Sequence, residues 1–420
     1  MIRILSCCIF LWGACVGSLR ADYLLIPMDN TQTDHLKSYG VAYWIIAHGI
    51  EVDWLLNYRG GSFMFKYSQV FEQELTIRGI SFERIPDAKS TQILSLIASE
   101  NNNMDAVKLE KTPKIAVYSP KSKQPWDDAV TLVLTYAEIP YDVVYDPEVM
   151  DGKLGEYDWL HLHHEDFTGQ YGKFWASFHT QAWYQNDVAE NEAVAKKYGY
   201  TKVSQLKLAV AKRIRDFVEK GGFLFAMCSA TDSYDIALCA DGLDICDVMY
   251  DGDPQDPSAQ SKLDFNRSFA FQNFILERNP AVYEYSNIDT SPYRMVPHDI
   301  DYFSLFEFSA KWDPVPTMLC QNHSLTIKGF MGQTTAFNKK FIKSEVLVMG
   351  EFKAFNEARY VHGNQGRGMW TFYGGHDPED YQHFVGDEPT DLSLHKNSPG
   401  YRLILNNVLF PAAKKKKQKT

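Results

Sequence analysis

A cysteine follows a short apolar run near the middle of the chain. The run FLFAM (223–227) comes after a Gly-Gly pair, and Cys228 is followed by the small residues 229–231. An apolar run this short predicts a buried central strand, and the polar turn after it is where an α/β sheet presents ligand-binding groups. Cys228 would then lie near a helix N-terminus, where backbone amides and the helix dipole favour a thiolate. The alternative is that Cys228 is a small buried side chain that fills the core.

A histidine and two carboxylates follow a second apolar run, MWTFY, in the same way. Gly-Gly is followed by His376, Asp377 and, after a proline, Glu379. A thiol, a base within its reach and an acid that orients the base are the parts of a cysteine hydrolase. Cys228 would be the nucleophile, His376 the base, Asp377 or Glu379 the orienting acid, and the Ser229 amide an oxyanion donor. This chemistry needs no cofactor.

A third group of polar residues ends the segment 156–166. It contains His161, His163, His164 and Glu165. On a strand, His161 and His163 would share one face and His164 would lie on the other. These residues could be metal ligands, acid–base groups or substrate-binding donors, or His161 could simply be packed in the strand. A further possibility is that His163 or His164 serves as the base for Cys228. The sequence contains no HExxH or paired CxxC motif, so it leaves metal binding open.

Strands and helices alternate around these residues. The expected strands are 114–119, 141–146, 156–166 and 221–227, and the expected helices are 125–139, with Asp127 near its start, 202–220 and 398–413. This alternation predicts an α/β fold, a three-layer sandwich with a mostly parallel, flavodoxin-like sheet. Because the carboxyl ends of parallel strands meet at one edge, Cys228 and His376 would lie at the same edge of the sheet if their strands are neighbours.

The N-terminal part predicts a separate α/β lobe, residues 22–110. Its expected strands are 23–28, 52–58 and 80–85, and its expected helices are 33–48, 70–78 and 91–100. The turn Arg59-Gly-Gly-Ser could bind an anion through Arg59 and backbone amides, or could be a simple turn into a helix. The main domain would then be 111–413, with a loop-rich insertion at 236–350 that contains short β segments (FSLFEFS, PTMLC, SLTIKGF and VLVMGEF), and 414–420 would be a basic tail.

Composition limits the function classes. The net charge of −11 argues against a nucleic-acid partner, and a small-molecule substrate is expected instead. Residues 1–21 are typical of a secretion signal, with no later transmembrane segment, so the protein would be secreted or periplasmic. A lipoprotein attached at Cys15 is the alternative. In an oxidising compartment Cys239 and Cys246 could form a disulfide. The sequence does not determine the oligomeric state.

Three stretches resemble the ThuA-like (trehalose-utilisation) family of the class I glutamine amidotransferase-like superfamily. They are GGFLFAMCSAT, GRGMWTFYGGHDPED and SPGYRLILNNVLF, and the likeness covers roughly residues 112–413 in the family's order. The resemblance implies a flavodoxin-like fold, with Cys228 at the position of the amidotransferase nucleophile. It also implies that His376 and Glu379 correspond to the histidine and glutamate of the His-Pro-Glu motif of the amidotransferases. ThuA-like chains usually lack a cysteine there, and the family implies a sugar-like ligand. The whole chain also resembles exported bacterial proteins labelled "asparagine synthetase B", although it has no SGGxDS loop.

Three functions therefore remain open. The first is a hydrolase of an amide or related acyl substrate that uses Cys228, His376 and Asp377 or Glu379. The second is a metal-dependent or sugar-related enzyme that uses His163, His164, Glu165 and His376. The third is a non-catalytic binding protein of the cell envelope.

Overall fold

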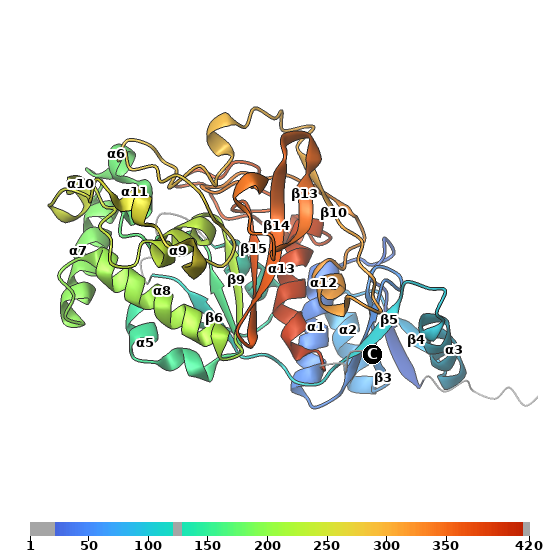
Figure 1. Ribbon diagram of the computed structural model, residues 1–420. Coiled ribbons are helices and arrows are strands. Elements are labelled where there is room, and N and C mark those ends of the chain that lie inside the picture. Colours follow the sequence, from blue (N-terminus) through green and yellow to red (C-terminus); the bar gives the residue numbers. More distant parts are fainter. Residues whose placement is uncertain (1–21, 121–127, 415–420) are drawn as a thin grey trace, which may run out of the picture.

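The computed structural model describes residues 22–120 and 128–414, and it contains two β-sheets (Figure 1). The signal at 1–21 with Cys15, the helix start at Asp127 and the tail beyond Lys414 lie outside these residues. The smaller sheet has the strand order β4-β1-β3-β2-β5, and the larger one has the order β11-β10-β13-β14-β15-β9-β8-β6-β7, with β12 paired to β14. No helix of the described part is long and apolar enough to cross a membrane.

The smaller sheet belongs to the N-terminal segment and is antiparallel throughout. Its strands are β1 (Tyr23–Ile26), β2 (Val52–Leu56), β3 (Ser62–Lys66), β4 (Glu83–Ile85) and β5 (Asp105–Leu109). Its helices are α1 (His35–Ala47), α2 (Gln69–Ile77) and α3 (Asp87–Ala98). Alternate strand residues face opposite layers: Leu24 and Trp54 pack with α1 and α2, whereas Leu25 and Leu55 pack with α3. The expected α/β lobe is therefore present, with two strands, β3 and β5, that the sequence reasoning missed.

The turn at Arg59 connects two strands, so neither the anion site nor the turn into a helix predicted for it is present. β2 and β3 form an antiparallel hairpin, and the amides of Gly61 and Ser62 donate to the carbonyl of Tyr58. The Arg59 guanidinium contacts the carboxylates of Asp29 at 2.7 Å and Glu83 at 2.5 Å. Two acidic partners occupy the donors that an anion would need.

The larger sheet has a parallel half, which confirms the predicted fold class. Its parallel strands are β6 (Ile115–Tyr118), β7 (Asp142–Val144), β8 (Trp159–Leu162), β9 (Phe223–Met227) and β15 (Gly368–Tyr373). The helices around this half are α4 (Ala129–Tyr136), α5 (Asp146–Met150), α6 (Trp175–Phe178), α7 (Ala182–Lys197), α8 (Val203–Glu219), α9 (Ser229–Cys239) and α13 (Pro399–Leu409).

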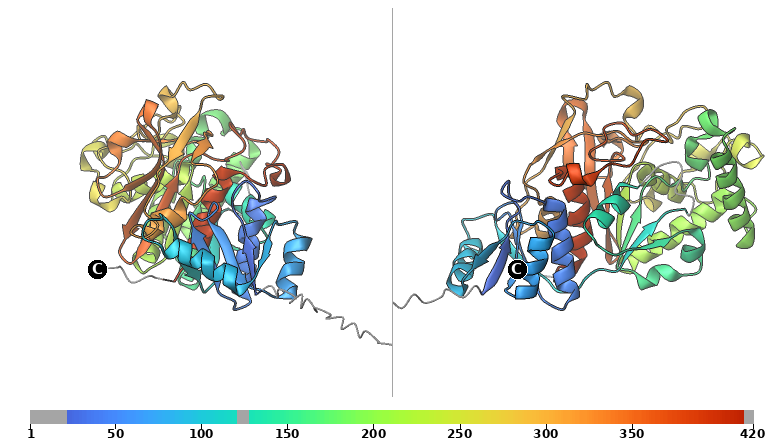
Figure 2. Two further views of the ribbon diagram at one scale, coloured as in Figure 1. Left: turned by 90° about the vertical axis from the view of Figure 1, so that its right-hand side faces the viewer. Right: turned by 180° about the vertical axis from the view of Figure 1, so that it is seen from behind.

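Residue alternation along these strands builds the three layers. Phe225 and Met227 of β9 pack with α1, α4 and α13, whereas Leu224 and Ala226 pack with α8 and α9 on the opposite face. Figure 1 shows α13 beside α1, and the view from behind in Figure 2 shows the same neighbourhood. The N-terminal lobe thus shares its core with the main sheet through these two helices.

Antiparallel strands extend the larger sheet. Three of them lie within the predicted insertion 236–350, namely β10 (Tyr302–Leu305), β11 (Thr326–Lys328) and β12 (Phe337–Asn338). β13 (Leu347–Phe352) begins at the end of the predicted insertion, and β14 (Glu357–Gln365) follows it. The short helices α10 (Val248–Asp251), α11 (Ala259–Lys262) and α12 (Pro314–Leu319) lie in the same region. The segment PTMLC, expected to be β, lies largely in α12, because prolines suit the first turn of a helix.

The four cysteines of the described chain, Cys228, Cys239, Cys246 and Cys320, are free and buried. Cys246 donates its thiol proton to the carbonyl of Thr168. The suggested Cys239–Cys246 disulfide is therefore not formed.

Candidate functional site

Four polar residues follow the carboxyl ends of neighbouring parallel strands. His163 comes directly after β8, Cys228 after β9 and His376 shortly after β15, and Asp128 precedes α4 in the connection that follows β6. The chain leaves β6 toward β7 on one side and returns to β8 on the other, so β6 and β8 flank a topological switch point. Open α/β sheets bind their ligands at such a point.

Asp128 joins two of the histidines. Its Oδ1 caps α4 by accepting from the amides of Val130 and Thr131, and it lies 3.4 Å from His163 Nδ1. Its Oδ2 lies 3.3 Å from His161 Nε2. Burial opposes the charge on Asp128, but the contacts with His161 and His163 outweigh it and hold the pKa of this carboxyl well below its usual range.

The contact with Asp128 determines which nitrogen of His163 carries a proton. His163 Nδ1 lies 3.4 Å from Asp128 Oδ1, and a carboxylate oxygen only accepts, so Nδ1 is the donor. When His163 is neutral, its lone pair is therefore at Nε2. His161 Nδ1 likewise lies 3.1 Å from the carbonyl of Phe225 and donates to it, and burial lowers the pKa of His161.

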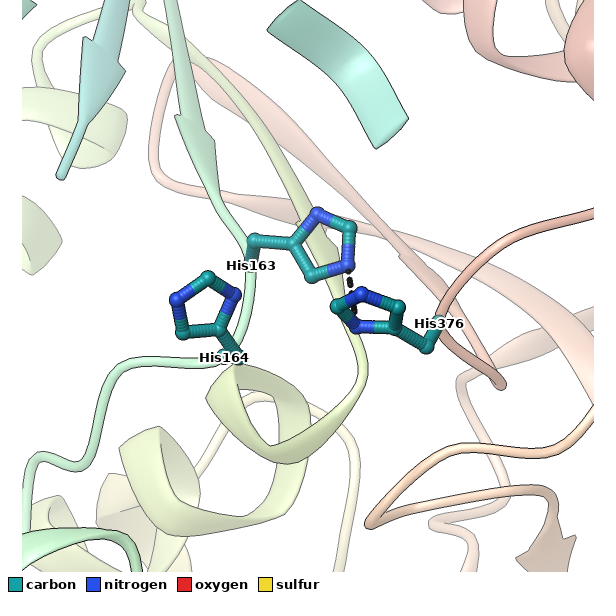
Figure 3. A group of neighbouring side chains, drawn as sticks. All are labelled: His163, His164 and His376. Carbon is teal, nitrogen blue, oxygen red and sulfur yellow. Dashed lines mark hydrogen bonds between the residues drawn. The ribbon is translucent and has the colours of Figure 1, made fainter. Parts of the chain in front are cut away.

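His163 Nε2 points to His376, and His164 completes a group of three imidazoles (Figure 3). The distance from His163 Nε2 to His376 Nδ1 is 3.0 Å. One ring nitrogen of each of His163, His164 and His376 lies within 4.8 Å of the others, and all three residues are buried. Two nitrogens bound tetrahedrally to zinc at about 2.0–2.1 Å are about 3.3 Å apart. To accept an ion, the closest pair has to open by about 0.3 Å, and a pair at the 4.8 Å limit has to close by about 1.5 Å.

The three histidines converge although His163 and His164 are adjacent in sequence. β8 ends at Leu162, so the alternation of faces expected for a longer strand does not extend to His164. Because the strand ends before His164, the expectation that His164 lies on the opposite face from His163 is wrong, and the two rings contact each other. His161 and His163 do share a face as predicted, since their rings are also in contact.

Glu165 lies beside the histidine group. Its Oε2 accepts from the His163 amide at 3.0 Å, whereas its Oε1 is buried without a hydrogen-bond partner among the described residues. Burial and the nearby charge of Asp128 raise the pKa of Glu165 to about 7. Glu165 and His164 both line one cavity, together with residues of α7 and α8. The group of histidines is thus connected to a pocket through these two side chains.

Cys228 has the backbone of a strained turn but not the environment of a thiolate. Its φ of 50° and ψ of −141° are uncommon for a residue with a side chain. Burial raises the pKa of the thiol to about 11, although the amides of Thr334, Gln333 and Ser229 act in the opposite direction. Only 3% of Cys228 is exposed. The predicted thiolate is therefore wrong, because the amides do not compensate for the loss of solvent.

The acidic residues after β15 have partners of their own. Glu379 Oε2 lies 3.0 Å from His395 Nδ1. Asp377 accepts from the amide of Glu379 and from the hydroxyl of Thr390. Asp128 is a carboxylate that is connected to His376 through His163. Near Cys228, the amide of Ser229 contacts the thiol, and its buried hydroxyl lacks a partner in the described part of the chain.

Two residues of this site were missed from the sequence. Asp128 lies inside the segment 125–139 that the sequence predicts as a helix, although an aspartate at a helix N-cap after a parallel strand lies at the ligand-binding edge. His383 stacks on His376 with ring centroids 5.3 Å apart, and its Nδ1 lies 2.7 Å from Asp380. Asp380 and His383 stand in the polar run after His376, but no spacing in the sequence shows that His383 folds back.

Comparisons with known proteins give only distant structural likenesses. No protein-family model and no curated protein sequence match the chain. The cytoplasmic proteins STM3548 and STM1381 of Salmonella typhimurium are 10% and 14% identical, each over 72% of this chain and 100% of its own, with TM-scores of 0.33. Gan42B, a GH42 beta-galactosidase from G. stearothermophilus, is 11% identical over 63% of this chain and 28% of its own, with a TM-score of 0.29. These likenesses are too remote to bear on family or activity.

Proposed function

We propose that the chain is a metal-dependent enzyme whose divalent ion is held by His163, His164 and His376. The convergence of three buried imidazoles from the ends of two strands is the observation that supports this function. Three histidines with an open fourth position form a common catalytic zinc site, and imidazole also suits other first-row metals. The proposal differs from the expectation of no cofactor, which belonged to the cysteine mechanism.

The surrounding residues supply what such a centre requires. His163 donates Nδ1–H toward Asp128, which fixes its ring and directs its Nε2 lone pair toward His376. His376 donates Nδ1–H to the lone pair of His163 Nε2, so this lone pair is free for an ion only when that hydrogen bond breaks. Ion binding and the His163–His376 hydrogen bond therefore exclude each other.

The reaction class that fits these residues is hydrolysis. A bound ion of this kind supplies a Lewis acid and an activated water. Glu165 lies beside the ligands with Oε1 unused in the pocket wall, and it is placed to accept a proton from the water and return it to the leaving group. The stacked ring of His383 positions His376 from the other side.

Metal analysis of the purified protein tests this function. We expect about one equivalent of zinc or another first-row metal after dialysis, and loss of that metal in His163→Ala and His376→Ala. His48→Ala, at an exposed position at the end of α1, is the matched control and should keep it. A wild-type protein that binds no first-row metal at micromolar concentration refutes the function and leaves the non-catalytic binding protein.

A second substitution tests the orienting carboxylate. Asp128→Asn should weaken metal binding about 10- to 100-fold, as expected when the hydrogen-bond partner of a ligating histidine is altered. The asparagine oxygen can still cap α4, so the circular dichroism spectrum should not change. A competition titration with a metal-binding dye measures the affinity. Unchanged affinity in this variant would show that Asp128 acts only as a helix cap.

The cysteine hydrolase remains a second candidate because of the strained backbone at Cys228. A residue held at positive φ directly after a central strand is typical of a nucleophile at a strand-to-helix turn. In that case the substrate would be an amide or related acyl compound. The order of β9 with its turn, β15 with His376, and α13 also supports placing the chain in the ThuA-like branch. The signal-like residues 1–21 support an exported protein, secreted or periplasmic.

A further inference from the structure

A cavity extends from His164 and Glu165 between α7 and α8. Its other charged residues are Asp166, Asp187 and Lys207. Four aromatic side chains also line it, namely Tyr145, Tyr171, Phe174 and Trp183. The cavity thus has one end at the histidine group and aromatic and acidic walls beyond it.

The single cation of the wall has no donor left for a ligand. Lys207 Nζ contacts Asp146 Oδ2 at 2.7 Å, the hydroxyl of Tyr145 at 3.1 Å and that of Tyr118 at 3.3 Å. An ammonium group has three N–H donors, and all three are used. Asp146 is buried and neutralises the charge of Lys207. An anionic ligand group would therefore find no free cationic side chain in this wall.

Two of the three acidic residues have acceptors to spare, whereas Asp166 accepts from Thr168 and Gly172. Glu165 is 5% exposed, and its Oε1 has no hydrogen-bond partner among the described residues. Asp187 on α7 is half-buried, and within the described part of the chain it accepts from the side chain of Asn191 through Oδ1. A buried carboxylate oxygen without a donor, such as Glu165 Oε1, is costly, and a ligand that brings N–H groups and positive charge compensates for it. Aromatic faces such as that of Trp183 also attract cations.

We propose that this cavity is a binding site for a cationic group, a protonated amine, with Asp187 as the residue that selects for its charge. This inference rests on the proposed function in one respect. The amine-bearing ligand would be the substrate of the metal centre, with its reacting end near His164 and Glu165. The uncharged sugar-like ligand implied by the ThuA resemblance is the competing outcome.

A series of three small probes of equal length tests the charge preference. Butylammonium, 1-butanol and butyrate differ only in their polar end, and binding to the full-length protein is measured by saturation-transfer NMR. We expect butylammonium to bind at least about tenfold more tightly than the other two, the factor associated with one charge-assisted hydrogen bond. Equal binding of butylammonium and butanol, preference for butyrate, or no binding of any probe overturns the proposal.

A matched pair of substitutions on α7 locates the site. Asp187→Asn should reduce butylammonium affinity about tenfold and leave butanol unchanged, whereas Glu190→Gln, at an exposed position of the same helix, should change neither. An unchanged preference in Asp187→Asn overturns the role of Asp187. Running each titration with EDTA and with zinc separates the two proposals. Zinc binding without an ammonium preference refutes only this inference, and an ammonium preference without zinc binding refutes only the proposed function.

Discussion

Alkylation of Cys228 distinguishes the two candidate chemistries, and its rate follows from the burial of the thiol. With a pKa of about 11 instead of 9.0, the thiolate fraction at pH 8 falls from about 9% to about 0.1%, a factor of about 90. A thiolate of higher pKa is more nucleophilic by about 6- to 10-fold over two pKa units. The net chemical effect is therefore about a tenfold slower reaction, and burial of Cys228 slows it further.

The assay is iodoacetamide labelling at pH 7 to 10, with mass spectrometry of the peptide that contains Cys228. We expect Cys228 in the native protein to react at least about tenfold more slowly than in the same protein unfolded in urea. Cys228→Ser confirms the assignment of the peptide. Cys239, which burial shifts to a pKa of about 12, should react as slowly and provides an internal reference.

One result would refute this reasoning and restore the cysteine hydrolase. It is labelling of native Cys228 that is faster than in urea, with an apparent pKa well below about 8.5. If His376→Ala then raised that pKa, His376 would be the base, and the metal function would lose its main ligand to another role.

Two further predictions concern stability. Burial raises the pKa of Asp232 from 3.8 to about 7, so the folded state favours the protonated carboxyl group. The free energy of unfolding should therefore fall by up to about 4 kcal/mol as the pH rises from about 4 to 7. Asp232→Asn should remove this fall in urea titrations at pH 4.5 and 8; equal pH dependence in both proteins would contradict it. Arg402 donates to the carbonyls of Met28 and Gly60 at the junction of the two sheets, and Arg402→Met leaves both without these donors. We expect Arg402→Met to lower the free energy of unfolding, measured in urea, by about 2–6 kcal/mol. The control Arg213→Met, at an exposed position, should change it little. If both variants lower it equally, the junction is held by packing alone.

Local pattern was sufficient for the elements that carry the site. The apolar runs that became β6, β8, β9 and β15 are short and bounded by glycine or polar residues, and each forms a strand close to its expected place. Helices with long amphipathic stretches, such as α8 and α13, were found as well. These elements could be predicted because their periodicity is local and their ends have turn residues.

Pairing of strands could not be predicted in the N-terminal lobe. Nothing near β3 and β5 in the sequence shows that they join β1 and β2 in an antiparallel sheet. The Arg59 turn was misassigned for the same reason, because a hairpin and a turn into a helix can both begin with glycines directly after a strand. α7 was missed because few of its residues are buried, and its sequence has no continuous apolar face.

The sequence by itself determined the chemical types available at one edge of the sheet. Histidines after β8, a cysteine after β9 and a histidine after β15 had to meet there once the strands were parallel, because parallel strands end at a common edge. Only the tertiary structure shows which of these side chains are buried and which of them lie in contact. Burial of Cys228 depends on side chains and amides from distant segments such as 333–334, and the connection of Asp128 to His163 crosses from one strand to its neighbour. Solvent exclusion and distances of a few ångströms are properties of the packed chain, and no local spacing encodes them.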